Sequence, residues 1–244
     1  MAQSNATTIQ SKVALVTGGS KGIGFAVAEA LVKEGVNVAI TARTAAEVEA
    51  AAERLNQTGA GRALGLRCDV RDLKAQEQVV NSTVEEFGRL DLLVANAGVG
   101  TFGTVDALEA NEWHRVIDTN LTGVFYSVKA SVAVLKKHRG MIVTISSLAG
   151  KNPFRGGSAY NASKFGLNGF SEAIMLDLRE QGVRVTTIMP GSVATYFGGS
   201  APAPADDWKI QPEDIGAMVV YLFSVPERTL PSRIEVRPSF PRKG

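Results

Sequence analysis

The chain of 244 residues is long enough for one large α/β domain and short for two. A net charge of +2 gives no electrostatic reason to expect binding to nucleic acid or to an anionic membrane. The single cysteine, Cys68, excludes an internal disulfide and argues against a metal cluster, so no metal is expected. The polar start and the lack of a long apolar run predict no signal peptide, no membrane span and a cytoplasmic protein.

Short β-branched runs alternate with longer amphipathic stretches along the chain. Strands are expected at Val13–Val16, Val36–Thr41, Ala63–Cys68, Asp91–Ala95, Met141–Ser146, Val183–Met189 and Ile234–Arg237. Helices are expected at Ile23–Glu34, Ala45–Asn56, Leu73–Phe87, Leu121–His138, Ser158–Gln181 and Glu213–Ser224. Glycines that would end helices stand at Gly35, Gly88, Gly140 and Gly182. The strands are continuously apolar, which is typical of a parallel sheet covered on both faces.

Alternation of this kind predicts a doubly wound α/β fold, a Rossmann fold. We expect a flexible polar segment at residues 1–11 and a single domain over residues 12–244. The stretch Gly198–Pro204 is rich in Gly, Ala, Ser and Pro, and we expect it to be a mobile loop inside that domain.

Residues 17–24 read T-G-G-S-K-G-I-G and join the first expected strand to the first expected helix. Glycines let the chain turn sharply and let a pyrophosphate approach the backbone, while the helix N-terminus offers free N–H groups to it. A tight turn without a ligand is the alternative, but a strand before and a helix after favour a dinucleotide site. The residues expected around the phosphates are Gly18, Ser20, Lys21, Gly22, Ile23 and Gly24.

The spacing T-G-x-x-x-G-x-G resembles that of the short-chain dehydrogenase/reductase family in its compact form, and the resemblance extends from Lys12 to Leu222. It implies a seven-stranded parallel sheet of order 3-2-1-4-5-6-7 with three helices on each face. It also implies an oxidoreductase that moves a hydride between a nicotinamide cofactor and a carbonyl or secondary alcohol carbon.

Tyr160 and Lys164 stand four residues apart, on one face of an expected helix. A phenol titrates near pH ~10 and is a poor base at neutral pH, so an ammonium one turn away should lower its pKa. The pair matches the family's Y-x-x-x-K motif, in which the tyrosine is the general acid or base. A surface lysine beside a half-buried tyrosine is the alternative.

Two further residues match catalytic positions of the family. Ser147 lies thirteen residues before Tyr160, and the resemblance implies that its hydroxyl polarises the substrate carbonyl. Asn120, in T-N-L-T-G, matches the asparagine that holds a relay water near the lysine. Its alternative role is to kink or cap a helix.

The remaining cofactor contacts follow from the same resemblance, at the ends of the third, fourth and sixth strands. They are Asp69 and Val70 at the adenine, Asn96, Ala97 and Gly98 near the ribose, and Pro190, Gly191, Val193 and Thr195 at the nicotinamide. We expect Asn96 to be structural and nearby Asp72 to cap the following helix. His114 and His138 are expected to be solvated helix residues outside the site.

Cofactor choice depends on the residue that follows the second strand. An NAD site places an acid about 20 residues after the glycine turn. Here Arg43 stands at the end of that strand, and the first acid, Glu47, lies inside the next helix. Arg43 and Lys21 would attract a 2′-phosphate, which predicts NADP(H). Two solvated surface cations are the alternative.

The substrate pocket is expected to be mainly apolar, walled by Leu148, Phe154, Tyr196, Phe197 and Trp208. The ending Ser232–Phe240 departs from the glycine-rich V-D-G-G ending of β-ketoacyl-thioester reductases, which argues against an acyl-carrier substrate and against their tetramer contacts. We therefore expect a small-molecule carbonyl or alcohol substrate.

Surplus apolar residues on Leu121–His138 and Ser158–Gln181 predict a homodimer through these helices, or a dimer of dimers that makes a homotetramer. A non-catalytic nucleotide-sensing protein on the same fold is the alternative function. A sugar-nucleotide epimerase would need a longer segment after Thr195.

Overall fold

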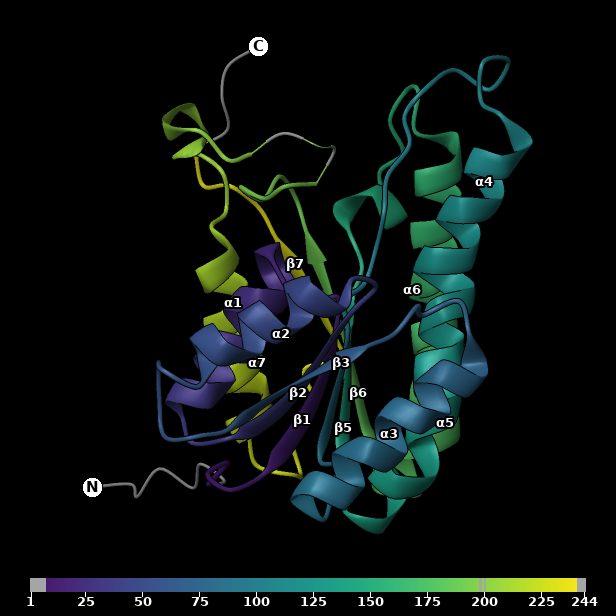
Figure 1. Cartoon of the computed structure of the whole chain (residues 1–244). Helices are drawn as coiled ribbons and strands as arrows, with labels where there is room; N and C mark the ends of the chain where they lie inside the picture. The colour runs from purple at the N-terminus through teal and green to yellow at the C-terminus, as the bar shows by residue number, and fades with distance from the viewer. Residues whose placement is uncertain (1–7, 198, 200, 241–244) are drawn as a thin grey trace.

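The computed structural model describes residues 8–197, 199 and 201–240, in which a parallel sheet lies between two layers of helices (Figure 1). The strands are β1 (Val13–Thr17), β2 (Asn37–Ala42), β3 (Ala63–Arg67), β4 (Leu92–Ala95), β5 (Met141–Ile145), β6 (Arg184–Pro190) and β7 (Arg233–Val236). Their order is β3-β2-β1-β4-β5-β6-β7, with every neighbouring pair parallel. Both the doubly wound fold and the strand order are confirmed.

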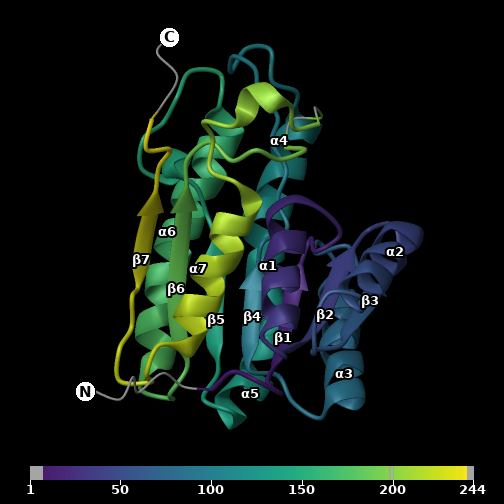
Figure 2. The same ribbon diagram turned by 90° about the vertical axis from the view of Figure 1, so that its left-hand side faces the viewer.

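The helices are α1 (Gly22–Lys33), α2 (Ala45–Leu55), α3 (Leu73–Phe87), α4 (Ala110–Ile117), α5 (Gly123–Lys137), α6 (Ser158–Arg179) and α7 (Pro212–Ser224). Figure 2, turned by 90°, shows α1 and α7 side by side in front of the sheet. None of the helices in the described part of the chain is long and apolar enough to cross a membrane.

Side chains on the two faces of the sheet form two separate hydrophobic clusters. On β1, Ala14 and Val16 pack with α1, α2 and α7, whereas Val13 and Leu15 pack with α3, α5 and α6. Successive residues of a strand point to opposite faces, so a strand buried on both sides must be apolar throughout. This explains why the central strands β1, β4 and β5 are largely apolar, whereas the edge strand β7 alternates.

The start of the expected helix Leu121–His138 is wrong. The α-helix begins at Gly123, and a π-helical turn over Asp118–Thr122 joins it to α4, a helix that the sequence did not predict. The end of α5 also differs, because Arg139 adopts the left-handed conformation there (φ 49°) and Gly140 does not. A Cβ on Gly140 would lie 2.7 Å from the carbonyl oxygen of Asp91, so this glycine serves close packing.

The described part of the N-terminal segment 1–11 packs on the domain. Ile9 is buried in the core, and the amide of Ser11 donates a hydrogen bond to the carbonyl of Gly35 at 2.9 Å. Residues 1–7 of this segment, and residues 198 and 200 of the expected loop Gly198–Pro204, lie outside the described residues.

Candidate active site

A cavity of about 750 Å³ lies at the carboxyl edge of the sheet, where the strands of a doubly wound fold present their loops. Residues expected to bind the cofactor that line it are Gly18, Ser20, Lys21, Gly22, Ile23, Arg43, Asp69, Val70, Asn96, Ala97, Gly98, Tyr160, Lys164, Pro190, Gly191, Val193 and Thr195. The structure thus brings together residues from the ends of β1 through β6.

The glycine turn passes close to the segment that follows β4. A Cβ on Gly18, whose φ is 65°, would lie 2.9 Å from the Cα of Ala97. A Cβ on Gly24 would lie 2.3 Å from the carbonyl oxygen of Gly18, so Gly24 packs α1 against the turn and does not line the cavity. Lys21 makes no side-chain cap on α1, which leaves the first N–H groups of that helix available to a ligand.

Asn96 fixes this turn to β4. Its amide nitrogen Nδ2 donates hydrogen bonds to the carbonyl oxygens of Thr17 and Gly18, at 2.9 and 3.1 Å. The hydroxyl of Thr17 accepts from the backbone amides of Asn96 and Ala97 in return. Asn96 therefore has the structural role that the sequence favoured for it.

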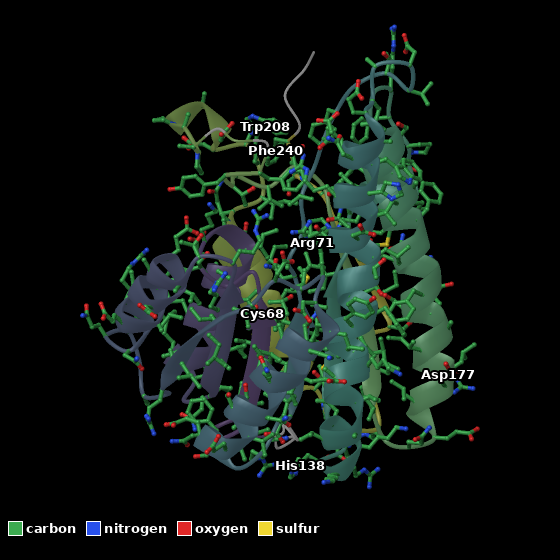
Figure 3. The ribbon with its side chains drawn as sticks, turned by 45° about the vertical axis from the view of Figure 1, so that its right-hand side comes forward. Cys68, Arg71, His138, Asp177, Trp208 and Phe240 are labelled. Atoms are coloured by element: carbon green, nitrogen blue, oxygen red, sulfur yellow. The ribbon has the colours of Figure 1, made fainter. Side chains whose placement is uncertain are left out.

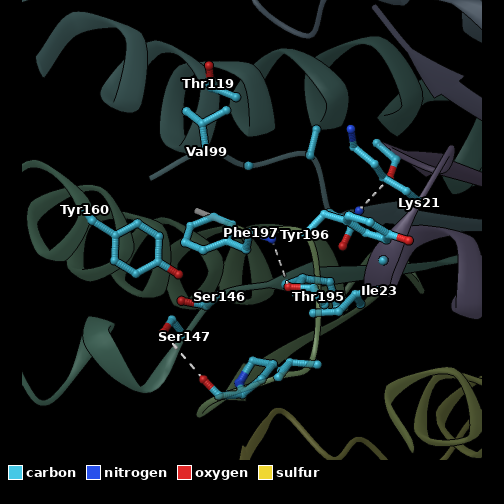
Figure 4. A pocket seen from close by; sticks show the side chains of 18 of the residues that line it. Lys21, Ile23, Val99, Thr119, Ser146, Ser147, Tyr160, Thr195, Tyr196 and Phe197 are labelled. Atoms are coloured by element: carbon cyan, nitrogen blue, oxygen red, sulfur yellow. Dashed lines mark hydrogen bonds between the residues drawn. The ribbon is translucent and has the colours of Figure 1, made fainter. Parts of the chain in front are cut away.

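Three side chains of the cavity lining come together, one from the loop after β5 and two from α6. Tyr160 and Ser147 share a hydrogen bond, and Ser147 Oγ also accepts from the amide of Ala149 at 3.1 Å. The same Oγ donates to the carbonyl of Pro190 at 3.4 Å, the bond drawn at Ser147 in Figure 4. The Nζ of Lys164, one turn along α6, lies 5.8 Å from the centroid of the Tyr160 ring. It donates a hydrogen bond to the carbonyl of Ile145 at 3.0 Å. The expected serine, tyrosine and lysine are thus adjacent.

Burial shifts the pKa values of both Tyr160 and Lys164. Removal from water raises the pKa of the Tyr160 phenol, and the hydrogen bond with Ser147 opposes the rise only partly. The same burial lowers the pKa of Lys164 to about 8. The expectation that Lys164 holds the phenol pKa below its ordinary value is therefore wrong for this structure, because desolvation is the largest cause for both groups.

Asn120 lies in the π-helical turn and is fully buried beneath the cavity. Its Oδ1 accepts from the amide of Val99 at 2.8 Å, and its Nδ2 donates to the carbonyl of Val99 and to Ser163 Oγ. A Cβ on Gly98 would lie 3.4 Å from Asn120 Oδ1 and 3.9 Å from Lys164 Nζ. The missing side chain of Gly98 therefore leaves space between Asn120 and the lysine. Such π-turns recur at functional sites.

Charged residues lie around the ends of β2 and β3. Arg43 is exposed and lines the cavity, and so does Glu47, which the sequence placed only inside the next helix. Asp69 pairs with Arg71 at 2.6 Å, and that guanidinium holds the pKa of the carboxyl below its usual range. The buried hydroxyl of Thr41, near the end of β2, lines the same cavity and has no hydrogen-bond partner among the described residues. Asp72 caps α3, as expected.

The other end of the cavity is aromatic. Leu148, Phe154, Tyr196 and Phe197 line it, and in Figure 4 the ring of Phe197 lies between Tyr160 and Tyr196. Trp208 is not among the lining residues and lies instead beside Lys209, whose Nζ is 5.9 Å from its ring.

Sequence reasoning missed Phe102. Its ring centroid is 5.8 Å from that of Tyr160, with the two planes at 69°. The loop after the N-A-G motif gave no sign of this contact.

The two histidines lie outside the site. His114 is exposed on α4, and His138 follows α5 just before β5 begins, at the end of the molecule away from Trp208 (Figure 3). Neither lines the cavity.

The family model described as short chain dehydrogenase matches residues 12–205. The chain belongs to the short-chain dehydrogenase family. This family assignment agrees with the order of the motifs along the chain.

Two curated relatives illustrate the range of this family. A trans-4-hydroxycyclohexanecarboxylate dehydrogenase of Sinomonas cyclohexanicum is 40% identical over 192 residues, 77% of this chain and 74% of its own. The glycine betaine reductase ATRR of Emericella nidulans is 37% identical over 94% of this chain. The match spans only 19% of that much longer protein.

Among solved structures, an alcohol dehydrogenase from the archaeon Thermococcus sibiricus, complexed with 5-hydroxy-NADP, superposes with a TM-score of 0.90. It is 31% identical, and the match covers 96% of this chain and 99% of the other. The chain is therefore an oxidoreductase of this family by sequence and by fold.

Proposed function

We propose that the protein interconverts a carbonyl compound and a secondary alcohol with NADP(H) as its cofactor. The observation that carries this proposal is the contact of Tyr160 with Ser147 beside the buried ammonium of Lys164. All three residues line the same cavity as the glycine turn. A hydroxyl donor, a phenol and a cation so placed suit an oxygen that gains negative charge during the reaction.

The residues at the carboxyl edge fit a dinucleotide. Gly18 allows the sharp turn with its φ of 65°, Gly24 lets α1 pack against that turn, and the N-terminus of α1 has no side-chain cap. The buried, unpartnered hydroxyl of Thr41 offers a further polar contact. We propose that these groups hold the pyrophosphate and adenosine, and that the segment Pro190–Thr195 holds the nicotinamide ring.

NADP rather than NAD is favoured by Arg43 and Lys21, two exposed cations that line the same cavity. A guanidinium can hold a phosphate through two hydrogen bonds, and its charge is independent of pH in the working range. The archaeal alcohol dehydrogenase that superposes on this chain carries an NADP derivative, which supports the same choice. Glu47 lines the cavity too, so the two cations must outweigh one carboxylate.

In the direction of reduction, a bound NADPH would supply the hydride that the carbonyl carbon accepts. Tyr160 donates its proton to the carbonyl oxygen, and its raised pKa keeps that proton in place at neutral pH. Ser147 donates a hydrogen bond to the same oxygen, and Lys164 stabilises the phenolate that remains. We propose that a water near Asn120 and Lys164 then returns a proton to Tyr160.

We also propose that two copies associate through α5 and α6. Phe125 on α5 is 43% exposed, and Phe165 and Leu176 on α6 are 46% and 55% exposed. Apolar side chains of this size on neighbouring helices are typical of a surface that another chain covers.

A panel of ketones, diketones, quinones and β-ketoacyl thioesters tests the proposed activity, with NADPH consumption followed by absorbance. We expect at least one class to be reduced. If NADPH binds and no class is reduced, and if the matching alcohols are not oxidised with NADP⁺, the protein is a nucleotide sensor and the proposal fails.

A further inference from the structure

Three phenylalanines surround the phenol of Tyr160, each from a different loop. Phe102 follows β4, Phe154 follows β5 and Phe197 follows β6. Their ring centroids lie 5.8, 6.4 and 5.4 Å from that of Tyr160. Phe102 also contacts Phe154 at 5.8 Å and Phe197 at 6.2 Å, so the four rings form one cluster. We call Phe102, Phe154 and Phe197 the aromatic wall.

Two glycines seat these rings against the backbone. A Cβ on Gly100 would lie 2.7 Å from Cζ of Phe197 and 2.9 Å from Cζ of Phe102. A Cβ on Gly157 would lie 2.6 Å from Cε2 of Phe154. Any side chain at Gly100 or Gly157 would displace a ring of the wall. The close approach of the three rings to the loop backbone therefore requires glycine at these two positions.

The wall is apolar and yet partly open to solvent. Phe102, Phe154 and Phe197 are 51%, 46% and 45% exposed, whereas the large side chains of the core are fully buried. Phe154 and Phe197 line the same cavity as Tyr160, whose hydroxyl would meet a carbonyl oxygen, and Phe102 contacts both rings without being among the lining residues. A ligand group attached to that carbonyl would therefore cover them, and removal of this apolar surface from water would favour its binding.

Charges in the described lining of the cavity lie elsewhere. Lys21, Arg43 and Asp69 follow β1, β2 and β3, Glu47 lies in the first turn of α2, and Lys164 lies one turn from Tyr160 on α6. Lys209, from the loop before α7, is paired with Asp206 at 2.7 Å. No charged side chain belongs to the aromatic wall, so a carboxylate or phosphate on the substrate would gain no ion pair from it.

We infer that the substrate is an aryl ketone or the matching aryl alcohol, whose ring packs on Phe102, Phe154 and Phe197 while its oxygen meets Tyr160. The inference rests on the proposed function and names its substrate class. Within the wall, Phe102 meets Phe154 tilted at 50° and Phe197 edge to face at 63°. A further aromatic ring can join such a cluster in the geometry that aromatic pairs prefer, which a saturated ring cannot do.

Two ketones of equal skeleton test this inference, 1-phenylethanone and 1-cyclohexylethanone. We expect kcat/KM with NADPH to be roughly tenfold higher for the phenyl compound, the size of one favourable aromatic contact. The N-acetylcysteamine thioester of acetoacetate, which has a polar arm and no ring, should be a poorer substrate than either. Equal efficiency for the two ring compounds, or a preference for the thioester, would overturn the inference and leave the proposed carbonyl chemistry standing.

Variants of the aromatic wall test whether it causes the preference for the phenyl ketone. Phe102→Leu and Phe154→Leu keep an apolar side chain and remove the ring, so the phenyl preference should fall to about twofold or less, without a matching loss for the cyclohexyl compound. Tyr221→Leu is the matched control, because Tyr221 is 61% exposed on α7 and does not line the cavity. A preference that survives in both wall variants, or that is lost in the control, would contradict the assignment.

A binding measurement does not require turnover. Titration calorimetry of both ketones into the protein with NADP⁺ should show roughly tenfold tighter binding of 1-phenylethanone, lost in Phe102→Leu. Tighter phenyl binding without any reduction would support the aromatic wall and reject the proposed activity. Equal binding of the two ketones would reject the proposed role of the aromatic wall in substrate binding, whether or not the protein reduces either ketone.

Discussion

The ammonium of Lys164 lies 5.8 Å from the centroid of the Tyr160 ring, one turn further along α6, and both groups are withdrawn from water. Burial favours the neutral form of each, so it raises the pKa of the phenol and lowers that of the ammonium to about 8. Tyr160 therefore keeps its proton at neutral pH, and Lys164 is the group of this pair that titrates near it.

This pair predicts the pH dependence of reduction. Below about pH 8 Lys164 is charged and can stabilise the phenolate, whereas above that value it loses its proton. We expect kcat/KM for reduction to fall as the pH rises through about 8. In Lys164→Arg the side chain stays charged, so the fall should move to higher pH. An unchanged midpoint in this variant would show that another group controls the profile.

Cofactor choice should depend on Arg43. A hydrogen bond to a charged group is worth roughly 1.5–3 kcal/mol, which corresponds to about 10- to 100-fold in efficiency. Arg43→Ala should lose most of a preference for NADPH through lower kcat/KM with NADPH, with NADH little changed.

Arg62→Ala is the control for cofactor choice, since Arg62 is exposed, is paired with Glu86 and does not line the cavity. Equal efficiency of NADPH and NADH in the wild type would refute the role of Arg43.

The packing of the glycine turn can be tested without cofactor. In Gly24→Ala the new Cβ would lie 2.3 Å from the carbonyl oxygen of Gly18. Such overpacking costs roughly 1–3 kcal/mol, which lowers Tm by roughly 2–12 °C in a domain of this size. Gly103→Ala is the control, because nothing lies within 4 Å of its Cβ position. Equal Tm values for the two variants would contradict the close approach of α1 to the turn.

The dimer proposal predicts a sedimentation result. At micromolar concentration the protein should sediment as a dimer or tetramer, and Phe165→Glu or Leu176→Glu should shift it toward the monomer, because a buried unpaired charge is costly. Tyr221→Glu, on the exposed face of α7, should leave the assembly intact if α5 and α6 form the interface. A monomeric wild type would reject the proposal.

The fold follows from the sequence because its signals are local. A strand buried on both faces must be largely apolar, as Val13–Val16 is, and a helix that ends in the left-handed conformation favours glycine, as at Gly88 (φ 80°). The π-turn at Asp118–Thr122 escaped prediction because its residues look like those of an α-helix, and only the backbone hydrogen bond from the Gly123 amide to the Asp118 carbonyl, five residues back, distinguishes it.

The site was predicted where residues lie in fixed motifs, and less well where distant loops meet. Tyr160 and Lys164 are one helical turn apart, so their proximity needs only the helix. Phe102 reaches Tyr160 through tertiary packing of distant loops, and Trp208, which the sequence placed in the pocket, is not among the lining residues. The pKa of Tyr160 depends on how much water the surrounding chain excludes, which spacing does not encode.

The turnover of Tyr160→Phe tests the central claim most directly. This change removes the proton donor and retains the ring, so kcat for carbonyl reduction should fall about 10²–10⁴-fold while the Kd for NADPH, measured by fluorescence, stays nearly constant. Tyr126→Phe, on α5 and outside the cavity lining, is the control and should match the wild type. A Tyr160→Phe enzyme with near wild-type kcat would contradict the assignment of Tyr160 as the proton donor.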